Sequence, residues 1–177
     1  MTVTDHTTSD RFQRAHRQDA SSRTLLADSL EFARVAYAGQ AGEFGEPAIE
    51  HPLRVMASLI GDDTKIVALL HDTLAHSVAT LVDLRALLPN RLLIAVSALG
   101  PVFEESEGIA SQVILADPIA RSVKLACIAD LADPVRLAQL DPFTRRRRES
   151  IGAAAAQALG TTLPKLLATW NSGRTRT

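Results

Sequence analysis

Apolar residues recur every three or four positions along most of the chain, which is the spacing of one face of an α-helix. The first such stretch, RTLLADSLEFARVAYAGQ, has apolar residues at this spacing and a glycine stop signal: Leu26, Leu30, Ala33, Tyr37 and Gly39. After a glycine-containing loop, HPLRVMASLIG predicts a second helix. Pro52 lies in its first turn, where a backbone N–H is not needed, and Gly61 ends it.

The stretch DDTKIVALLHDTLAHS predicts one continuous helix over residues 62–77. Thr80 and Asp83 then have the spacing of a capping box, with Asp in place of the usual Glu. NRLLIAVSALG predicts a short apolar helix, and Pro118 divides the next apolar stretch into two helices. A last helix opens at FTRRRRES and resumes near LPKLLATW after a turn.

No stretch alternates apolar and polar residues between turn signals, as a half-buried strand would. The sequence therefore predicts an all-α fold of about seven or eight helices without an internal repeat. Residues 1–22 are polar and lack an apolar period, which predicts a disordered tail. The folded domain is expected over residues 23–170, with a C-terminal tail over residues 171–177.

Composition narrows the class of protein. A chain of 177 residues with 46% hydrophobic residues can form one domain with a substantial core. The net charge of −1 gives no electrostatic signature of nucleic-acid binding. No apolar run approaches the roughly 20 residues of a membrane-spanning helix, and the N-terminus lacks the apolar centre of a signal peptide. We expect a cytoplasmic protein, and the single cysteine, Cys127, excludes an internal disulfide.

Candidate chemistry begins with KIVALLHDTLAHS, where His71 directly precedes Asp72 at the end of an apolar run. His51 lies 20 residues earlier, at a helix start after a tight loop, where it can reach a neighbouring helix. Imidazole nitrogens and carboxylate oxygens are common ligands of divalent metal ions. The residues alone leave two interpretations open, a metal site or a helix cap followed by a polar helix end.

Three segments in order, ARVAYAGQAGEFGEPAIEHPLRVMASLI, IVALLHDTLAHS and DPIARSVKLACIADLADPVRLAQL, resemble the HD-domain alarmone hydrolases. These comprise the hydrolase half of RelA/SpoT proteins and their small single-domain relatives, and the resemblance covers residues 24–160. It implies a helical HD fold that removes the 3′-pyrophosphate from (p)ppGpp. It also implies a manganese ion held by a histidine, the His-Asp pair and a distant aspartate.

When the family's functional positions are matched one by one to this sequence, three metal-ligand positions are kept and most other catalytic positions differ. His51 matches the first metal ligand, and His71 and Asp72 match the paired motif. The distant aspartate belongs to a family segment VKLAD, which reads VKLAC here, so Cys127 occupies the fourth ligand position. The family's Glu-Asp pair, which organises the attacking water, is replaced here by Ala75 and His76. The basic residues of its loop are replaced by Gly42 and Glu43, and the aromatic residue after the loop is replaced by Ala48.

A thiol in place of a carboxylate removes a hard, charged oxygen, so manganese affinity is expected to fall. Two histidines and a carboxylate can still bind zinc or iron, and a Cys127 thiolate favours zinc. In the other interpretation Cys127 is an ordinary core residue and the protein is metal-free. His76 is a candidate general base because it follows Asp72 by four residues on the predicted helix, and a solvated histidine at a helix end is the alternative. Lys124, retained from the family pattern, is a candidate substrate contact.

Three functions remain open. The first is a metal-dependent phosphohydrolase of pyrophosphohydrolase type with weak or absent alarmone hydrolysis, acting on a nucleotide or a small phosphate ester. The second is a non-catalytic nucleotide sensor, and the third is a helical scaffold for a partner or a homo-oligomer. Arg145 to Arg148 spread around all faces of a helix, so they favour a solvated helix start over an anion site.

Overall fold

The computed structural model describes residues 21, 23–42, 44–77, 79–100 and 107–174. Within this part of the chain the regular elements are helices, and β-pairing is confined to one isolated bridge between Ala41 and Pro47. The prediction of an all-α fold is therefore confirmed. The disordered tail predicted over residues 1–22 lies outside the described residues, except for residue 21.

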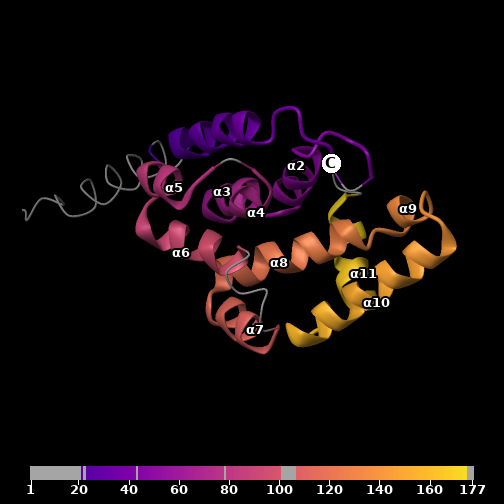
Figure 1. Ribbon diagram of the computed structural model, residues 1–177. Coiled ribbons are helices and arrows are strands. Elements are labelled where there is room, and N and C mark those ends of the chain that lie inside the picture. Colours follow the sequence, from indigo (N-terminus) through magenta and orange to yellow (C-terminus); the bar gives the residue numbers. More distant parts are fainter. Residues whose placement is uncertain (1–20, 22, 43, 78, 101–106, 175–177) are drawn as a thin grey trace, which may run out of the picture.

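A helix over residues 23–36 comes first, and the labelled elements follow it (Figure 1). Their bounds are α2 Glu50–Ser58, α3 Asp62–Leu70, α4 Thr73–His76, α5 Leu81–Leu87, α6 Asn90–Leu99, α7 Glu107–Ala116, α8 Pro118–Leu131, α9 Pro134–Leu137, α10 Pro142–Ala158 and α11 Leu163–Arg174. Two of them, α4 and α9, are single turns that the hydrophobic pattern did not predict as separate helices. The last, α11, continues past the domain boundary expected at residue 170.

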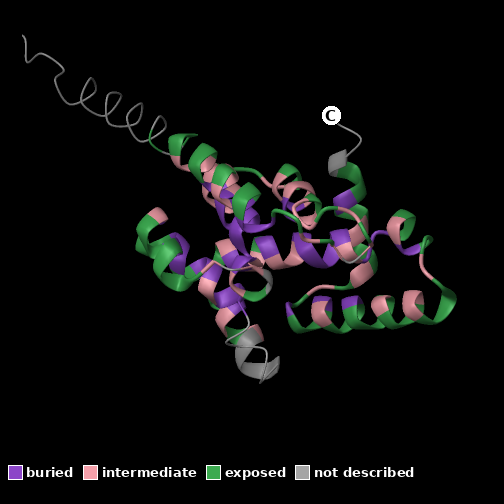
Figure 2. Cartoon of the chain, turned by 45° about the horizontal axis from the view of Figure 1, so that its top comes forward, coloured by how far each residue is buried: buried purple, intermediate pink, exposed green. Residues whose placement is uncertain are grey.

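Helix α8 forms the centre of the molecule (Figure 1). It packs against α2, α3, α6, α7, α10 and α11. Its buried side chains point in several directions because neighbours cover it on most sides. Figure 2 shows α8 mainly in the buried and intermediate colours, whereas α10 is largely exposed. Helix α3 is similarly enclosed, with five consecutive buried residues from Ile66 to Leu70. The core therefore lies where α3 and α8 meet.

Local sequence signals explain many helix boundaries. The capping box is present as predicted, with the Thr80 hydroxyl accepting from the Asp83 N–H and the Asp83 carboxylate accepting from the Thr80 N–H. Helices α8, α9 and α10 each begin with an Asp-Pro pair, in which the aspartate caps the free N–H groups and proline starts the helix: Asp117, Asp133 and Asp141. No described helix combines the length and apolar character needed to cross a membrane.

The prediction of one helix over residues 62–77 is wrong. Helix α3 ends at Leu70, and Asp72 is the N-cap residue of the separate turn α4. The Thr73 hydroxyl donates to the Leu70 carbonyl at 2.7 Å, which supplies a side-chain partner where the backbone ladder is interrupted. The break matters because it places His71 and Asp72 at a bend between α3 and α4.

Candidate metal centre

Four predicted site residues from three parts of the chain come together near the α3–α8 contact. His51 lies in the first turn of α2, His71 and Asp72 lie between α3 and α4, and Cys127 lies on α8. Ligand atoms of His51, His71 and Cys127 are all within 4.8 Å of one another. The Asp72 Oδ2 atom is 3.1 Å from His71 Nε2 and 4.0 Å from His51 Nε2. The Cys127 Sγ atom is 3.2 Å from His71 Nε2.

Both imidazoles direct Nε2 toward this cluster because their other nitrogen is occupied. The His71 Nδ1–H donates to the Ala68 carbonyl at 2.8 Å, and the His51 Nδ1–H donates to the Asp130 carboxylate at 2.8 Å. A carbonyl and a carboxylate can only accept, which assigns a proton to each Nδ1 atom. The neutral form of each ring therefore presents the Nε2 lone pair to the cluster.

This arrangement requires a cation or a shared proton between the side chains. A neutral His71 Nε2 and the Asp72 carboxylate oxygen are both acceptors, yet they lie 3.1 Å apart. Burial lowers the pKa of His71, but Cys127 and Asp72 outweigh it and raise that pKa well above its ordinary value. Burial raises the pKa of the Cys127 thiol, but His71 and His51 outweigh it and lower that pKa to about 6. These two pKa shifts favour an imidazolium–thiolate pair formed by His71 and Cys127.

The Tyr37 hydroxyl adds an unsatisfied polar group beside the cluster. Tyr37 is buried, and its hydroxyl has no hydrogen-bond partner within the described residues. Burial, followed by the charges of Asp72 and Cys127, raises the pKa of Tyr37, and the nearby backbone of Asp72 opposes part of the rise. A buried hydroxyl without a partner is unfavourable, so this oxygen fits a site that receives a further polar group. From sequence Tyr37 was interpreted only as a core position.

Asp130 and Arg54 complete the surroundings of His51, and neither was predicted from sequence. Asp130 is fully buried on α8, one turn after Cys127. Arg54 donates from Nε to Asp130 Oδ1 at 2.7 Å and from Nη2 to Asp130 Oδ2 at 3.0 Å. The spacing of three residues from Cys127 was the available signal, because it places Asp130 and Cys127 on the same side of a helix.

The loop before α2 is organised around Glu46. Its carboxylate accepts from Arg54 at 3.2 Å, from Arg136 at 2.5 Å and from the Phe44 N–H at 3.0 Å. The Arg136 guanidinium also lies over the Phe44 ring, 4.2 Å from its centre. Burial raises the pKa of Glu46, but the two arginines and backbone contacts outweigh it and lower that pKa to about 2. The two arginines nearest the loop are therefore bound to carboxylates.

Gly42 occupies a restricted position in the same loop. Its N–H donates to the Glu46 carbonyl at 2.6 Å. A Cβ atom added at Gly42 would lie 3.2 Å from both that carbonyl oxygen and the Glu46 side chain. A basic side chain at this position would therefore push against Glu46. The structure explains why the cation that the family pattern expects here would not fit without rearrangement.

The remaining predicted residues lie apart from the four-residue cluster or outside the described side chains. His76 is the last residue of α4, whose N-cap residue is Asp72, and its side chain is not among those described. Ala75 is exposed. Lys124 is partly buried on α8, one turn before Cys127, and forms no ion pair within the described residues. Arg145 to Arg148 lie on α10 with intermediate or full exposure, as expected of a solvated helix start.

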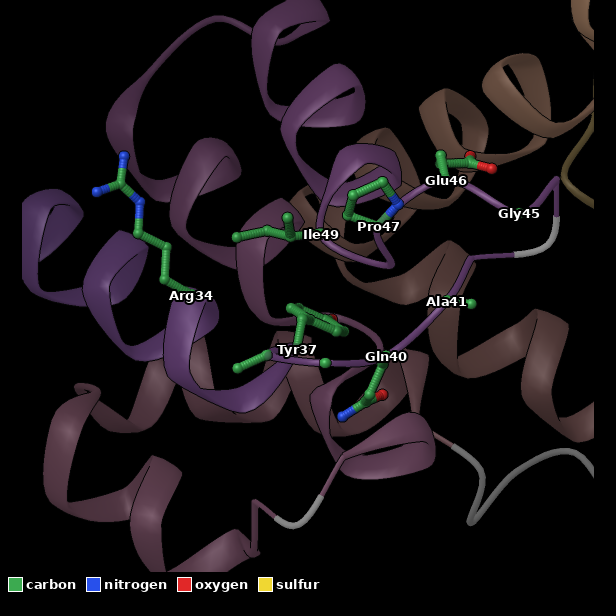
Figure 3. A pocket seen from close by; sticks show the side chains of 10 residues that line it. Arg34, Tyr37, Gln40, Ala41, Gly45, Glu46, Pro47 and Ile49 are labelled. Atoms are coloured by element: carbon green, nitrogen blue, oxygen red, sulfur yellow. The ribbon is translucent and has the colours of Figure 1, made fainter.

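A cavity of about 440 Å³ lies between the first helix and the loop before α2 (Figure 3). Its lining includes Arg34, Tyr37, Gln40, Glu46, Pro47 and Ile49. None of the four cluster residues lines it, but Tyr37 belongs to its wall and carries the hydroxyl that is influenced by Asp72 and Cys127. Tyr37 therefore links the wall of the cavity to the surroundings of the cluster.

Comparison with known proteins supports the fold. No protein-family model matches the chain, and no curated protein matches its sequence. A solved structure of a metazoan ortholog of SpoT, described as hydrolysing ppGpp and playing a role in starvation responses, is similar with a TM-score of 0.67. The two chains are 17% identical, and the match covers 86% of this chain and 95% of the other. The protein has an all-α, HD-domain-like fold.

Proposed function

We propose that this protein is a phosphohydrolase-like relative of the (p)ppGpp 3′-pyrophosphohydrolases that retains a metal centre and has weak or absent alarmone hydrolysis. The observation that carries the proposal is the convergence of His51, His71, Asp72 and Cys127 within this fold. Both histidines direct Nε2 to the same region through hydrogen bonds made by Nδ1. Hydrogen bonds that fix the orientation and tautomer of an imidazole in this way are typical of metal-ligating histidines.

The donor set suits zinc or iron better than manganese. Ligands of a tetrahedral zinc ion lie roughly 3.3–3.6 Å apart, given zinc bonds of about 2.0–2.3 Å. The contacts of His71 Nε2 with Asp72 and Cys127, at 3.1 Å and 3.2 Å, need only small adjustments to reach that spacing. A bound ion of this kind supplies Lewis-acid polarisation of a phosphoryl oxygen. A thiolate is a poor match for manganese, which prefers hard oxygen ligands.

The proposal of weak turnover depends on groups around the centre. Ala75 stands where the family pattern expects a carboxylate that organises water, and a positioned general base contributes about 10²–10⁴ in rate. Arg54 and Arg136 are paired with carboxylates, so they offer little free positive charge to a polyphosphate. Lys124 remains our candidate contact for a substrate phosphate, and His76 remains a candidate base.

Two measurements test this proposal. The first is the metal content of full-length protein purified without added metal, where we expect zinc or iron near one equivalent. The second is hydrolysis of ppGpp and pppGpp with manganese or zinc supplied, where we expect turnover far below that of the metazoan SpoT ortholog measured in parallel. Rapid manganese-dependent hydrolysis would contradict the proposal of a weakened site.

The cavity beside Tyr37 favours a second candidate function, a non-catalytic sensor for a nucleotide or small phosphate ester. It is large enough for part of a small ligand and is separate from the ligand cluster. Thermal-shift screening against nucleotides tests this candidate. A ligand present at 100 times its dissociation constant should stabilise the protein by about 2.7 kcal/mol. Stabilisation without hydrolysis would favour the sensor.

A further inference from the structure

Asp130 is a buried acid whose two carboxylate oxygens are both engaged. Oδ2 accepts the Nδ1–H of His51 at 2.8 Å and an N–H of Arg54 at 3.0 Å, and Oδ1 accepts from Arg54 at 2.7 Å. The side chain has no exposed surface. Burying an aspartate in this way is unfavourable unless its charge is paired, and Arg54 supplies that pairing.

Asp130 acts on the cluster only through His51. It lies one helical turn beyond Cys127, so it is the obvious acid to replace the aspartate missing at position 127. Both of its oxygens are already bound to His51 and Arg54. It therefore does not serve as the missing fourth ligand.

The contact determines both the tautomer and the direction of the His51 ring. A carboxylate at Nδ1 keeps the proton on that nitrogen, so the lone pair of the neutral ring lies at Nε2, on the side of Asp72 and His71. It also makes Nε2 a stronger donor to a metal ion. Arg54 prevents rotation of Asp130 because it binds both oxygens, and Glu46 in turn holds Arg54.

We infer that Asp130, held by Arg54, is a positioning residue that sets His51 for metal binding and thereby determines the affinity of the centre. This inference rests on the proposed metal centre and goes beyond it, because it assigns the affinity to a residue that touches no metal ion. Mutation of a residue that accepts a hydrogen bond from a metal-ligating histidine typically lowers metal affinity by about 10–100-fold.

The test is zinc affinity, measured by competition with a chromogenic chelator in the full-length protein and two variants. Asp130→Asn offers one acceptor oxygen where His51 and Arg54 require two, so we expect affinity to fall by about 10–100-fold. Asp133→Asn is the matched control, since Asp133 is also buried and close in the chain but caps α9 instead of contacting His51. It should leave zinc affinity within about twofold, in keeping with a change that removes no contact to a ligand.

Two further readouts separate positioning from general destabilisation. Arg54→Lys keeps the charge but loses the two-oxygen contact, so its zinc affinity should lie between those of the natural protein and Asp130→Asn. In the natural protein without metal, nitrogen NMR at a pH where His51 is neutral should show the proton on Nδ1. A proton on Nε2 would overturn the inference even if Asp130→Asn fails to fold.

The possible outcomes distinguish this inference from the proposed function. If the natural protein binds no zinc, iron or manganese, the proposed metal centre is wrong, and with it the role assigned to Asp130. If the natural protein binds zinc and Asp130→Asn binds it equally well, the centre stands and the positioning role is wrong. Equal losses in Asp130→Asn and Asp133→Asn would show general destabilisation and would also overturn the inference.

Discussion

The ligand cluster and the loop before α2 differ in how their charged groups are paired. In the cluster, the ligand atoms of His51, His71 and Cys127 lie close together, and His71 Nε2 also lies close to the Asp72 carboxylate. Neutral Nε2 and the carboxylate are both hydrogen-bond acceptors, so a proton or a cation must lie between them. At the loop, the charged groups pair with one another, because Glu46 binds both Arg54 and Arg136. The first arrangement needs a shared proton or a cation between its side chains, whereas the charges of the second are already paired.

Under the proposed function, the cluster holds a metal ion, whereas the loop offers little free positive charge to a polyphosphate. The cluster keeps ligands and the groups that orient them. The loop and α4 present Gly42 and Ala75 where a phosphohydrolase of the resembled family has cations and a carboxylate. We therefore expect binding chemistry to be easier to measure than turnover, and each experiment below changes one side of this comparison.

The largest effect is expected from restoring the missing carboxylates. The triple variant Cys127→Asp, Ala75→Glu, His76→Asp should raise ppGpp hydrolysis with manganese by about 10²–10⁴-fold if the loop contributes mainly to binding. Steady-state pyrophosphate release measures this. Residues that act as a unit are strongly non-additive, so the triple variant is the informative one.

Cys127→Asp alone is the control for that experiment. A hard oxygen in place of sulfur should raise manganese affinity, because two histidines and two carboxylates then surround the ion. Turnover should stay at background because Ala75 and His76 are unchanged. An active manganese hydrolase from this single change would show that the carboxylate pair is dispensable, and His76 would become the leading candidate for general base.

Removal of one ligand should break the cluster without affecting the loop. We expect His71→Ala to lower zinc affinity by about 100-fold or more, since a direct ligand should matter at least as much as the groups that orient it. Removing the buried imidazole also creates a cavity that lowers the stability of the fold, so thermal unfolding must be measured on the same samples. Undiminished zinc binding in a folded His71→Ala protein would place the metal elsewhere.

The cluster should also show a characteristic pH dependence. At pH 7 the favoured metal-free state is a Cys127 thiolate paired with a His71 imidazolium, since the pKa of the thiol is lowered to about 6 and that of the imidazole is raised. Zinc must then displace at least one proton, so affinity should fall about tenfold per pH unit as pH decreases. Below about pH 6 the thiol also binds a proton, and the fall should become steeper. Affinity that is independent of pH between 6 and 8 would contradict this protonation state.

The smallest effect is expected from adding a cation to the loop. Gly42→Arg should lower stability by about 1–3 kcal/mol, because its Cβ would lie 3.2 Å from the Glu46 carbonyl oxygen and side chain. Nucleotide affinity should change by less than about threefold, since Glu46 can bind the new guanidinium as it binds Arg54 and Arg136. Urea unfolding and nucleotide titration measure the two quantities. A large gain in nucleotide affinity would show that the loop lacks only charge and is not internally neutralised.

The sequence alone determined the helical class, several helix starts and the residues that make up the cluster. These features depend on neighbours three or four positions apart, as in the Thr80–Asp83 capping box, or on a resemblance between short segments. The cluster could therefore be named before its geometry was known. The break at His71 and Asp72 could not, because the apolar period continues through it and the interruption of the helix is visible only in the folded chain.

Tertiary structure alone decided which groups surround that cluster. Asp130 meets His51 across 79 positions in the chain, and Arg136 meets Glu46 across 90, so no local pattern relates them. That the Tyr37 hydroxyl lacks a partner among the described residues likewise becomes evident only when Tyr37 packs into the core. Charge pairs and buried hydroxyls depend on which helices become neighbours, and that choice follows from packing of the whole core, not from the spacing within any one segment.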